Sequence, residues 1–113
     1  MKSLNKIQLI GHLGIDPEVK SLENGKIARF TLATDDSYRD KQGNKVEQTD
    51  WHNIVAWRGL AEIIEKYTKK GSKIYVEGKS KSRSWEDKEG QKRYTTEVIA
   101  ESFILLDKKE SED

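Results

Sequence analysis

Side chains that alternate between two faces run through most of this sequence, and one segment departs from that pattern. Alternation with a period of two is typical of β-strands. Strands or shorter extended segments are expected over residues 5–13, 18–22, 26–34, 50–57, 73–85 and 92–106. The one proline, Pro17, leaves the other segments free to form uninterrupted ladders of backbone hydrogen bonds. The sequence therefore predicts a protein built mainly from β-sheet.

One segment has the periodicity of a helix instead. Its apolar side chains recur at helical spacing and form one stripe, which consists of Leu60, Ile63, Ile64 and Tyr67. We expect Gly71, which follows two lysines, to cap this helix at its C-terminal end. Residues 35–49 are polar, and a long exposed loop or a loose hairpin arm is expected there.

The elements follow one another as three strands, a helix and two strands. This is the order of the oligonucleotide/oligosaccharide-binding (OB) fold, a five-stranded Greek-key barrel, here with one helix between strands 3 and 4. Other small β-barrels with one helix share that order. We expect an all-β domain over residues 1–106 and a short, acidic, flexible tail over residues 107–113.

Composition excludes several classes of protein. The 113 residues include no cysteine, which excludes a disulfide scaffold, a thiolate metal site and a cysteine nucleophile. The longest apolar run is four residues, 103–106, whereas a membrane-spanning helix needs about 20. The first residues lack the apolar stretch of a secretory signal. We therefore expect a soluble protein of the cytoplasm.

Residues that could support catalysis are few. The two histidines, His12 and His52, have no carboxylates near them at the spacing of a zinc site. No glycine-rich phosphate loop is present. Asp35, Asp36 and Asp40 leave one alternative, a nuclease that uses Mg²⁺. We expect no enzymatic activity, no metal and no cofactor.

The formal net charge of +1 hides a strongly basic region. Residues 66–93 carry ten basic and four acidic side chains, a local charge of +6. Charges act over about 10 Å at 0.1 M salt, so a polyanion responds to this region rather than to the total. A solvated, lysine-rich surface is the alternative interpretation.

Within the basic region, alternation places Lys79, Lys81, Arg83 and Trp85 on one face of a strand. Neighbours on that face lie about 6.6 Å apart. Cations interleaved with an indole suit the repeating phosphates and bases of a single nucleic-acid strand. A hairpin whose lysines discourage edge pairing would explain the cations, but it would not explain Trp85.

Three further aromatic residues fit the same pattern. Trp51 and Trp57 share one face of the 50–57 strand, and the opposite face is apolar enough for a barrel interior, apart from His52. Tyr38 lies next to Arg39 in the polar loop. The alternative is that both tryptophans belong to the core. We expect His52 to be buried or at an interface, where a backbone group satisfies it.

Several blocks of sequence, in the correct order from residue 5 to residue 106, resemble the bacterial and mitochondrial single-stranded DNA-binding protein family. They include Asn5-Lys6-Ile7, Gly11-His12-Leu13-Gly14, Thr31-Leu32-Ala33-Thr34, Gln48-Thr49-Asp50-Trp51-His52, Lys70-Gly71-Ser72, Val76-Glu77-Gly78 and Arg93-Tyr94-Thr95-Thr96-Glu97-Val98. The resemblance implies an OB fold that assembles as a homotetramer and binds single-stranded DNA without sequence preference. It implies roles in DNA replication, recombination and repair, at the nucleoid.

The resemblance also implies roles for particular residues. The base-stacking positions are Tyr38, Trp51, Trp57 and Trp85. The positions that fit phosphate contacts are Arg39, Lys41, Lys70, Lys79, Lys81, Arg83 and Arg93. Subunit contacts are expected from Lys6, from His52 and from the segment 5–10.

One feature of the family pattern is missing. Bacterial members usually continue into a Gly/Gln/Pro-rich linker with an acidic tip that ends in Pro-Phe, whereas this sequence ends in an acidic segment, residues 108–113, without an apolar terminus. Replication and repair proteins stay candidate partners, although the tip that usually recruits them in the family is absent from this sequence. A second hypothesis for the whole chain is an OB-type protein-interaction module, such as a primosome accessory subunit.

Overall fold

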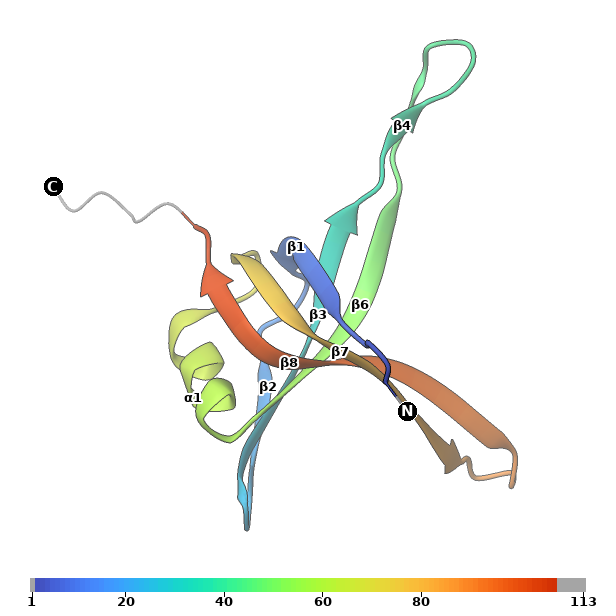
Figure 1. The fold of residues 1–113 in the computed structure, drawn as a ribbon. Helices are drawn as coiled ribbons and strands as arrows, with labels where there is room; N and C mark the ends of the chain where they lie inside the picture. Colours follow the sequence, from blue (N-terminus) through green and yellow to red (C-terminus); the bar gives the residue numbers. More distant parts are fainter. Residues whose placement is uncertain (1, 108–113) are drawn as a thin grey trace, which may run out of the picture.

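The computed structural model describes residues 2–107, which form one helix and eight strands (Figure 1). The elements are β1 (Ile7–Leu13), β2 (Glu18–Leu22), β3 (Gly25–Asp35), β4 (Tyr38–Arg39), β5 (Lys45–Val46), β6 (Thr49–Trp57), α1 (Arg58–Tyr67), β7 (Lys73–Glu86) and β8 (Lys92–Leu105). Every extended segment expected from the alternation is present. The expected acidic tail, apart from Asp107, lies outside the described residues.

Five strands close on themselves, as the OB fold requires. The sheet order is β1-β7-β8-β6-β3-β2, and an additional pairing of β1 with β3 completes the ring. The β6–β8 pair is parallel and the others are antiparallel. The β1–β3 contact needs a glycine, because a Cβ atom at Gly11 would collide with the Ala33 carbonyl. The all-β, five-stranded fold predicted from the sequence is confirmed.

Three hairpins extend from the ring (Figure 1). β2 pairs only with β3, through a turn in which Gly25 has a φ of +117°. β4 and β5 form a separate two-stranded arm beyond β3 and β6, so residues 35–49 are a hairpin arm. The far halves of β7 and β8 form the third hairpin.

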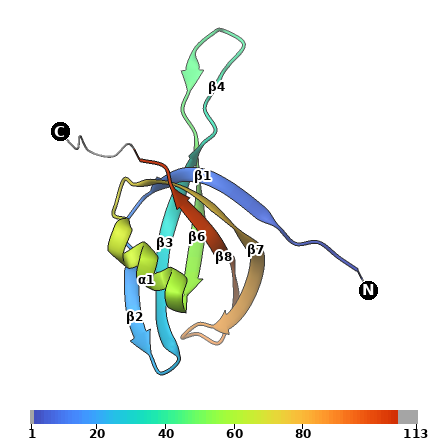
Figure 2. The ribbon, with the colours of Figure 1, turned by 60° about the vertical axis from the view of Figure 1, so that its left-hand side comes forward.

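The core lies inside the ring and follows the alternation of its strands. Its largest fully buried side chains are Leu32, Ile54, Ile64, Ile74 and Val76. The helix α1 packs against β3, β6 and β8, and its residues Ala61 and Ile64 complete the core (Figure 2). As expected, α1 follows the third long strand of the ring, β6.

The helix ends three residues earlier than a Gly71 cap requires, so that prediction is wrong. Thr68 is the C-terminal cap: its Oγ1 and its backbone N both donate to the Ile64 carbonyl, at 2.7 and 3.1 Å. Gly71 has a φ of +92° and turns the chain between α1 and β7. The Thr68 hydroxyl donates a hydrogen bond to a carbonyl of the last helical turn, so the helix ends at Thr68 and does not extend to Gly71.

Candidate nucleic-acid interface

Four neighbouring strands present one continuous surface outside the ring. We call it the outer face, and it consists of Arg29, Trp51, Asn53, Trp57, Lys79, Lys81, Arg83, Trp85, Thr95 and Glu97. The strand register brings the outward side chains of β3, β6, β8 and β7 together. Arg29 pairs with Val55, Val55 with Ile99, and Ile99 with Lys79. Directly paired residues project to the same side of a sheet.

β6 places its two indoles on the outer face. Trp51 and Trp57 are 60% and 46% exposed, whereas Ile54 and Ala56, which alternate with them, are buried. The interpretation of both tryptophans as core residues is therefore excluded. Val55 lies between them and is buried in the floor of the surface.

The ring of Trp51 rests on the chain that links β1 to β2. A Cβ atom at Gly14 would collide with this ring and would lie 2.7 Å from Oγ1 of Thr31. Packing on one side holds the indole in place, while most of its surface stays open to solvent.

The β7–β8 hairpin carries the cations that alternation predicted. Lys79, Lys81 and Arg83 are exposed on the side that Trp85 shares. Trp85 is 45% exposed, and its Nε1 donates to Oγ1 of Thr95 at 3.3 Å. That hydrogen bond orients the third indole along the hairpin.

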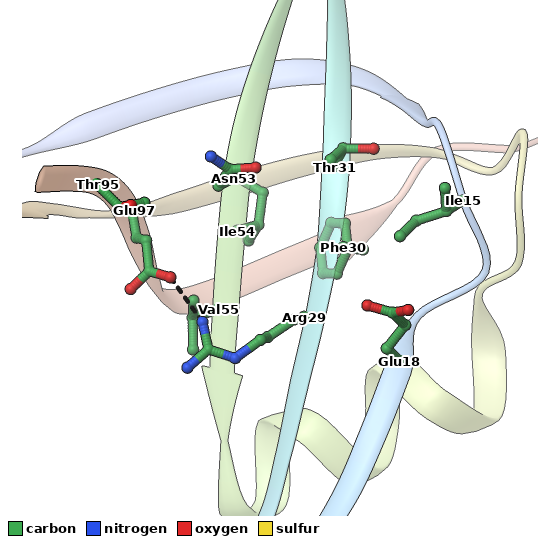
Figure 3. A pocket seen from close by; sticks show the side chains of 10 residues that line it. All are labelled: Ile15, Glu18, Arg29, Phe30, Thr31, Asn53, Ile54, Val55, Thr95 and Glu97. Atoms are coloured by element: carbon green, nitrogen blue, oxygen red, sulfur yellow. Dashed lines mark hydrogen bonds and ion pairs between the residues drawn. The ribbon is translucent and has the colours of Figure 1, made fainter. Parts of the chain in front are cut away.

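Two hollows of about 300 and 260 Å³ lie on the outer face. The larger is lined by Arg29, Val55, Trp57, Lys79, Lys81, Arg83, Glu97 and Ile99. The smaller lies across β3 and β6, and Figure 3 shows the Arg29 and Glu97 side chains meeting at its border. Cations, an indole and apolar floor residues thus line a surface that can accept both phosphates and bases.

The other residues expected at the site lie elsewhere. Tyr38, Arg39 and Lys41 are carried by the β4–β5 arm, where Tyr38 is 53% exposed and Arg39 Nη1 donates to the Gly43 carbonyl at 2.8 Å. Lys70 lies in the turn after α1, with its backbone N bonded to Asp16. The residues expected at the site are therefore divided between the outer face, the arm and this turn.

Arg93 lies on the outer side of the β7–β8 hairpin, where it pairs with Trp85 in the register. Its Nε donates to Oδ2 of Asp87 at 2.9 Å. The pKa of Asp87 is lowered, first by the backbone N–H of Gln91 and then by Arg93. A phosphate approaching Arg93 would compete with this carboxylate.

Two exposed side chains were missed by the sequence reasoning. Arg29 lies on the outer face, and the alternation of β3 with its neighbours could have placed it there once the β3–β6 pairing was known. Tyr94 is 71% exposed on the side of the β7–β8 hairpin opposite Trp85, and only its two neighbouring basic residues marked it in the sequence.

The residues expected at subunit contacts lie away from the outer face. Lys6 Nζ is 3.3 Å from Oε2 of Glu77, on the β1–β7 side of the ring. The Tyr75 hydroxyl and then Lys6 lower the pKa of Glu77. His52 is half-buried, and its Nε2 lies 3.0 Å from Oγ1 of Thr34. The expected backbone partner of His52 is thus replaced by a side chain.

The carboxylates considered for Mg²⁺ serve local turns instead. Asp35 accepts from the hydroxyl and the N–H of Ser37, and both hydrogen bonds lower its pKa. Asp40 accepts from the N–H groups of Gln42 and Asn44. Within residues 2–107, no three His, Cys, Asp or Glu side chains gather as a metal site would need. The helix in this part of the chain is too short and too polar to cross a membrane.

Comparison with known proteins shows which family this chain belongs to. Residues 4–106 match the model of the single-strand binding protein family. This chain is a member of that family. Curated members with high identity to this chain are named single-stranded DNA-binding proteins.

Curated members of the single-strand binding protein family and a solved structure support the assignment. The chain is 52% identical to single-stranded DNA-binding protein 1 of Xylella fastidiosa (strain 9a5c), across 97% of this chain and 82% of that protein. It is 46% identical to the protein of the same name from Chlorobaculum tepidum, across 97% and 69%. A structure of the Plasmodium falciparum single-strand binding protein in complex with single-stranded DNA superimposes with a TM-score of 0.84, at 40% identity and over 95% of this chain and 98% of that chain.

Proposed function

We propose that this protein binds single-stranded DNA without sequence preference, by stacking bases on exposed aromatic rings between cations that neutralise phosphates. Membership of the single-strand binding protein family supports the DNA partner. The observation that carries the mechanism is the outward position of all three tryptophans, each at least 45% exposed. Unpaired bases have free faces for these rings, and every base has such a face.

Base stacking falls to Trp51, Trp57 and Trp85 on the outer face and to Tyr38 on the arm. Their spread over separate elements suits a strand that passes along the outer face and reaches the arm. Phosphate contacts fall to the seven cations Arg39, Lys41, Lys70, Lys79, Lys81, Arg83 and Arg93. Exposure of these residues, on the elements that carry the aromatic rings or close to them, supports both assignments.

A titration with oligo(dT) tests this function, with a duplex of equal length as the control. Stacking should quench tryptophan fluorescence, and the complex should weaken with salt by about 0.7 in log K per log salt for each phosphate neutralised. The duplex should bind much more weakly, because its bases are covered by each other. Absence of both quenching and a salt-sensitive complex would show that this function is wrong.

We also propose that the protein assembles as a homotetramer. Ile10 on β1, Tyr75 on β7 and Ile104 on β8 are aligned in the register, and the two isoleucines are 55% and 56% exposed. Apolar side chains in such a row are suited to contact another copy. The nearby Lys6–Glu77 pair fits the edge of such contacts, and we propose a second subunit contact at the half-buried His52.

Sedimentation measures this assembly. The wild type should have the mass of four chains, and Ile10→Asp should yield smaller species because it places a charge in the apolar row. A wild type that sediments as a single chain would contradict the homotetramer.

Residues 1–106 act as one DNA-binding domain. The protein acts in DNA replication, recombination and repair, at the nucleoid of the cytoplasm. The protein coats DNA and has no catalytic activity, metal or cofactor. Single strands should therefore stay intact during incubation with Mg²⁺. A protein-interaction module is the second candidate, but the core of a protein-binding surface would tend to exclude lysines such as Lys79 and Lys81 on the outer face.

A further inference from the structure

One carboxylate lies in the middle of the surface that is proposed to bind a polyanion. Glu97, on β8, is 8% exposed as a residue and faces outward, directly paired with Lys81. It borders both hollows of the outer face. A carboxylate at this point repels phosphate. Its presence there is explained only if it also contributes favourably to DNA binding.

The contacts of Glu97 show what the carboxylate holds. Its Oε2 accepts from Nη1 of Arg29 at 2.6 Å, and its Oε1 lies 3.4 Å from Nε of Arg83 (Figure 3 shows the first pair). The two arginines come from β3 and β7, on either side of the sheet region that contains β6 and β8. The buried carboxylate of Glu97 thus holds the guanidinium groups of Arg29, from β3, and Arg83, from β7.

Each guanidinium group keeps donors free for a ligand. Arginine has five N–H donors in a rigid fork, and Glu97 engages one nitrogen of each arginine. The side chains of Arg29 and Arg83 remain 41% and 52% exposed. Long side chains that are held on one edge lose less conformational entropy when their other donors bind an anion.

We propose that Glu97 is a positioning residue that presents Arg29 and Arg83 to DNA phosphates, and that Arg29 is itself a phosphate contact. The inference rests on the proposed function, since it needs a DNA strand on the outer face. Lys79 and Lys81 in the same hollow are not held by this carboxylate through any ion pair among the described residues. Positioning therefore concerns the two arginines.

The charge change and the positioning effect have opposite signs, which makes a sharp test. Removing a negative charge from the surface should by itself strengthen binding of a polyanion. Loss of the anchored arginines should weaken binding. We expect positioning to prevail, because charge-assisted hydrogen bonds fix both the place and the direction of a guanidinium group.

The experiment compares Glu97→Gln with the wild type in oligo(dT) titrations over a series of salt concentrations. Glu62→Gln, which removes the same charge from exposed α1, is the control. We expect Glu97→Gln to bind about fivefold more weakly and its log K–log salt slope to be shallower by about 0.7 to 1.4, the value for one or two phosphates. Equal or tighter binding, or an unchanged slope, would overturn the proposal.

A second background separates positioning from a purely structural role. With Arg29→Gln and Arg83→Gln already present, Glu97→Gln should no longer weaken binding. The same fivefold loss there would overturn the proposal, because Glu97 would then act without the arginines. If Glu97→Gln does not fold, the single variants Arg29→Gln and Arg83→Gln take its place, and each should lower the slope by about 0.7.

An unchanged slope in both arginine variants would also overturn the inference. A wild type that fails to bind oligo(dT) at all would overturn the proposed function, so the two failures are distinct.

Discussion

The indole of Trp51 rests on Gly14, where no side chain larger than a hydrogen atom fits between the ring and the backbone. The glycine belongs to the link between β1 and β2, so a local feature of one connection fixes the orientation of a ring on β6. A proposed stacking platform thereby depends on a residue that makes no contact with DNA in this account.

Replacing Gly14 with alanine should displace Trp51. We expect the variant to lose up to about 1–3 kcal/mol of binding free energy, the contribution of one stacked base. A titration with oligo(dT) measures this loss. Gly59→Ala is the matched control, because the new Cβ would meet no atom beyond its chain neighbours and the nearby backbone of α1 within 4 Å. Unchanged affinity in Gly14→Ala would show that packing of Trp51 on Gly14 does not contribute to DNA binding.

The lysines of the outer face should act by charge rather than by shape. Lys81→Gln should reduce the log K–log salt slope by about 0.7, because one phosphate loses its cation. The reduction should be similar for different base sequences. Lys66→Gln on α1 removes the same charge outside the outer face and should leave the slope unchanged. Equal slopes for wild type and Lys81→Gln would remove Lys81 from the phosphate contacts.

The turn between β7 and β8 should depend on the charge of Asp87. Hydrogen bonds from Gln91, Arg93 and Glu89 favour the ionised carboxylate and lower its pKa below the ordinary 3.8. A group with a lowered folded pKa stabilises the fold above its unfolded pKa, and the contribution is lost as pH falls through the folded pKa. The turn should therefore be intact at pH 5 and loosen below about pH 3.8.

Amide hydrogen exchange at Gln91 measures this effect, and Asp87→Asn should show fast exchange already at pH 5. The variant should also release Arg93, which is tied to the same carboxylate. Slow exchange at Gln91 in Asp87→Asn would contradict the role given to the carboxylate.

Much of the fold follows from short-range pattern. Alternation located every long strand, because each lies between a solvent side and a packed interior, as Ile54 and Trp51 on β6 illustrate. The end of α1 was misplaced, because the sequence does not reveal whether a hydroxyl such as Thr68 will reach the Ile64 carbonyl. Side-chain caps of this kind depend on local backbone geometry.

The candidate site was less accessible to sequence reasoning. The faces of β6 and β7 could be assigned from alternation alone, so Trp57 and Lys81 were expected to point outward. The cluster of Arg29, Glu97 and Arg83 joins β3 to the β7–β8 hairpin, and Arg29 and Glu97 are 68 residues apart in the sequence. Only the strand register shows that these side chains meet, and the preference of carboxylates for the outside of a protein gives no hint of it.

The central claim is that exposed rings hold unpaired bases, and the variant Trp51→Ala with Trp85→Ala tests it most directly. Binding of oligo(dT) at fixed salt should weaken by about 1–3 kcal/mol for each ring removed, while sedimentation shows the same assembly as the wild type. Tyr67→Ala, which removes a 56% exposed ring from α1, should bind like the wild type. A folded double variant with wild-type affinity for oligo(dT) would contradict the account.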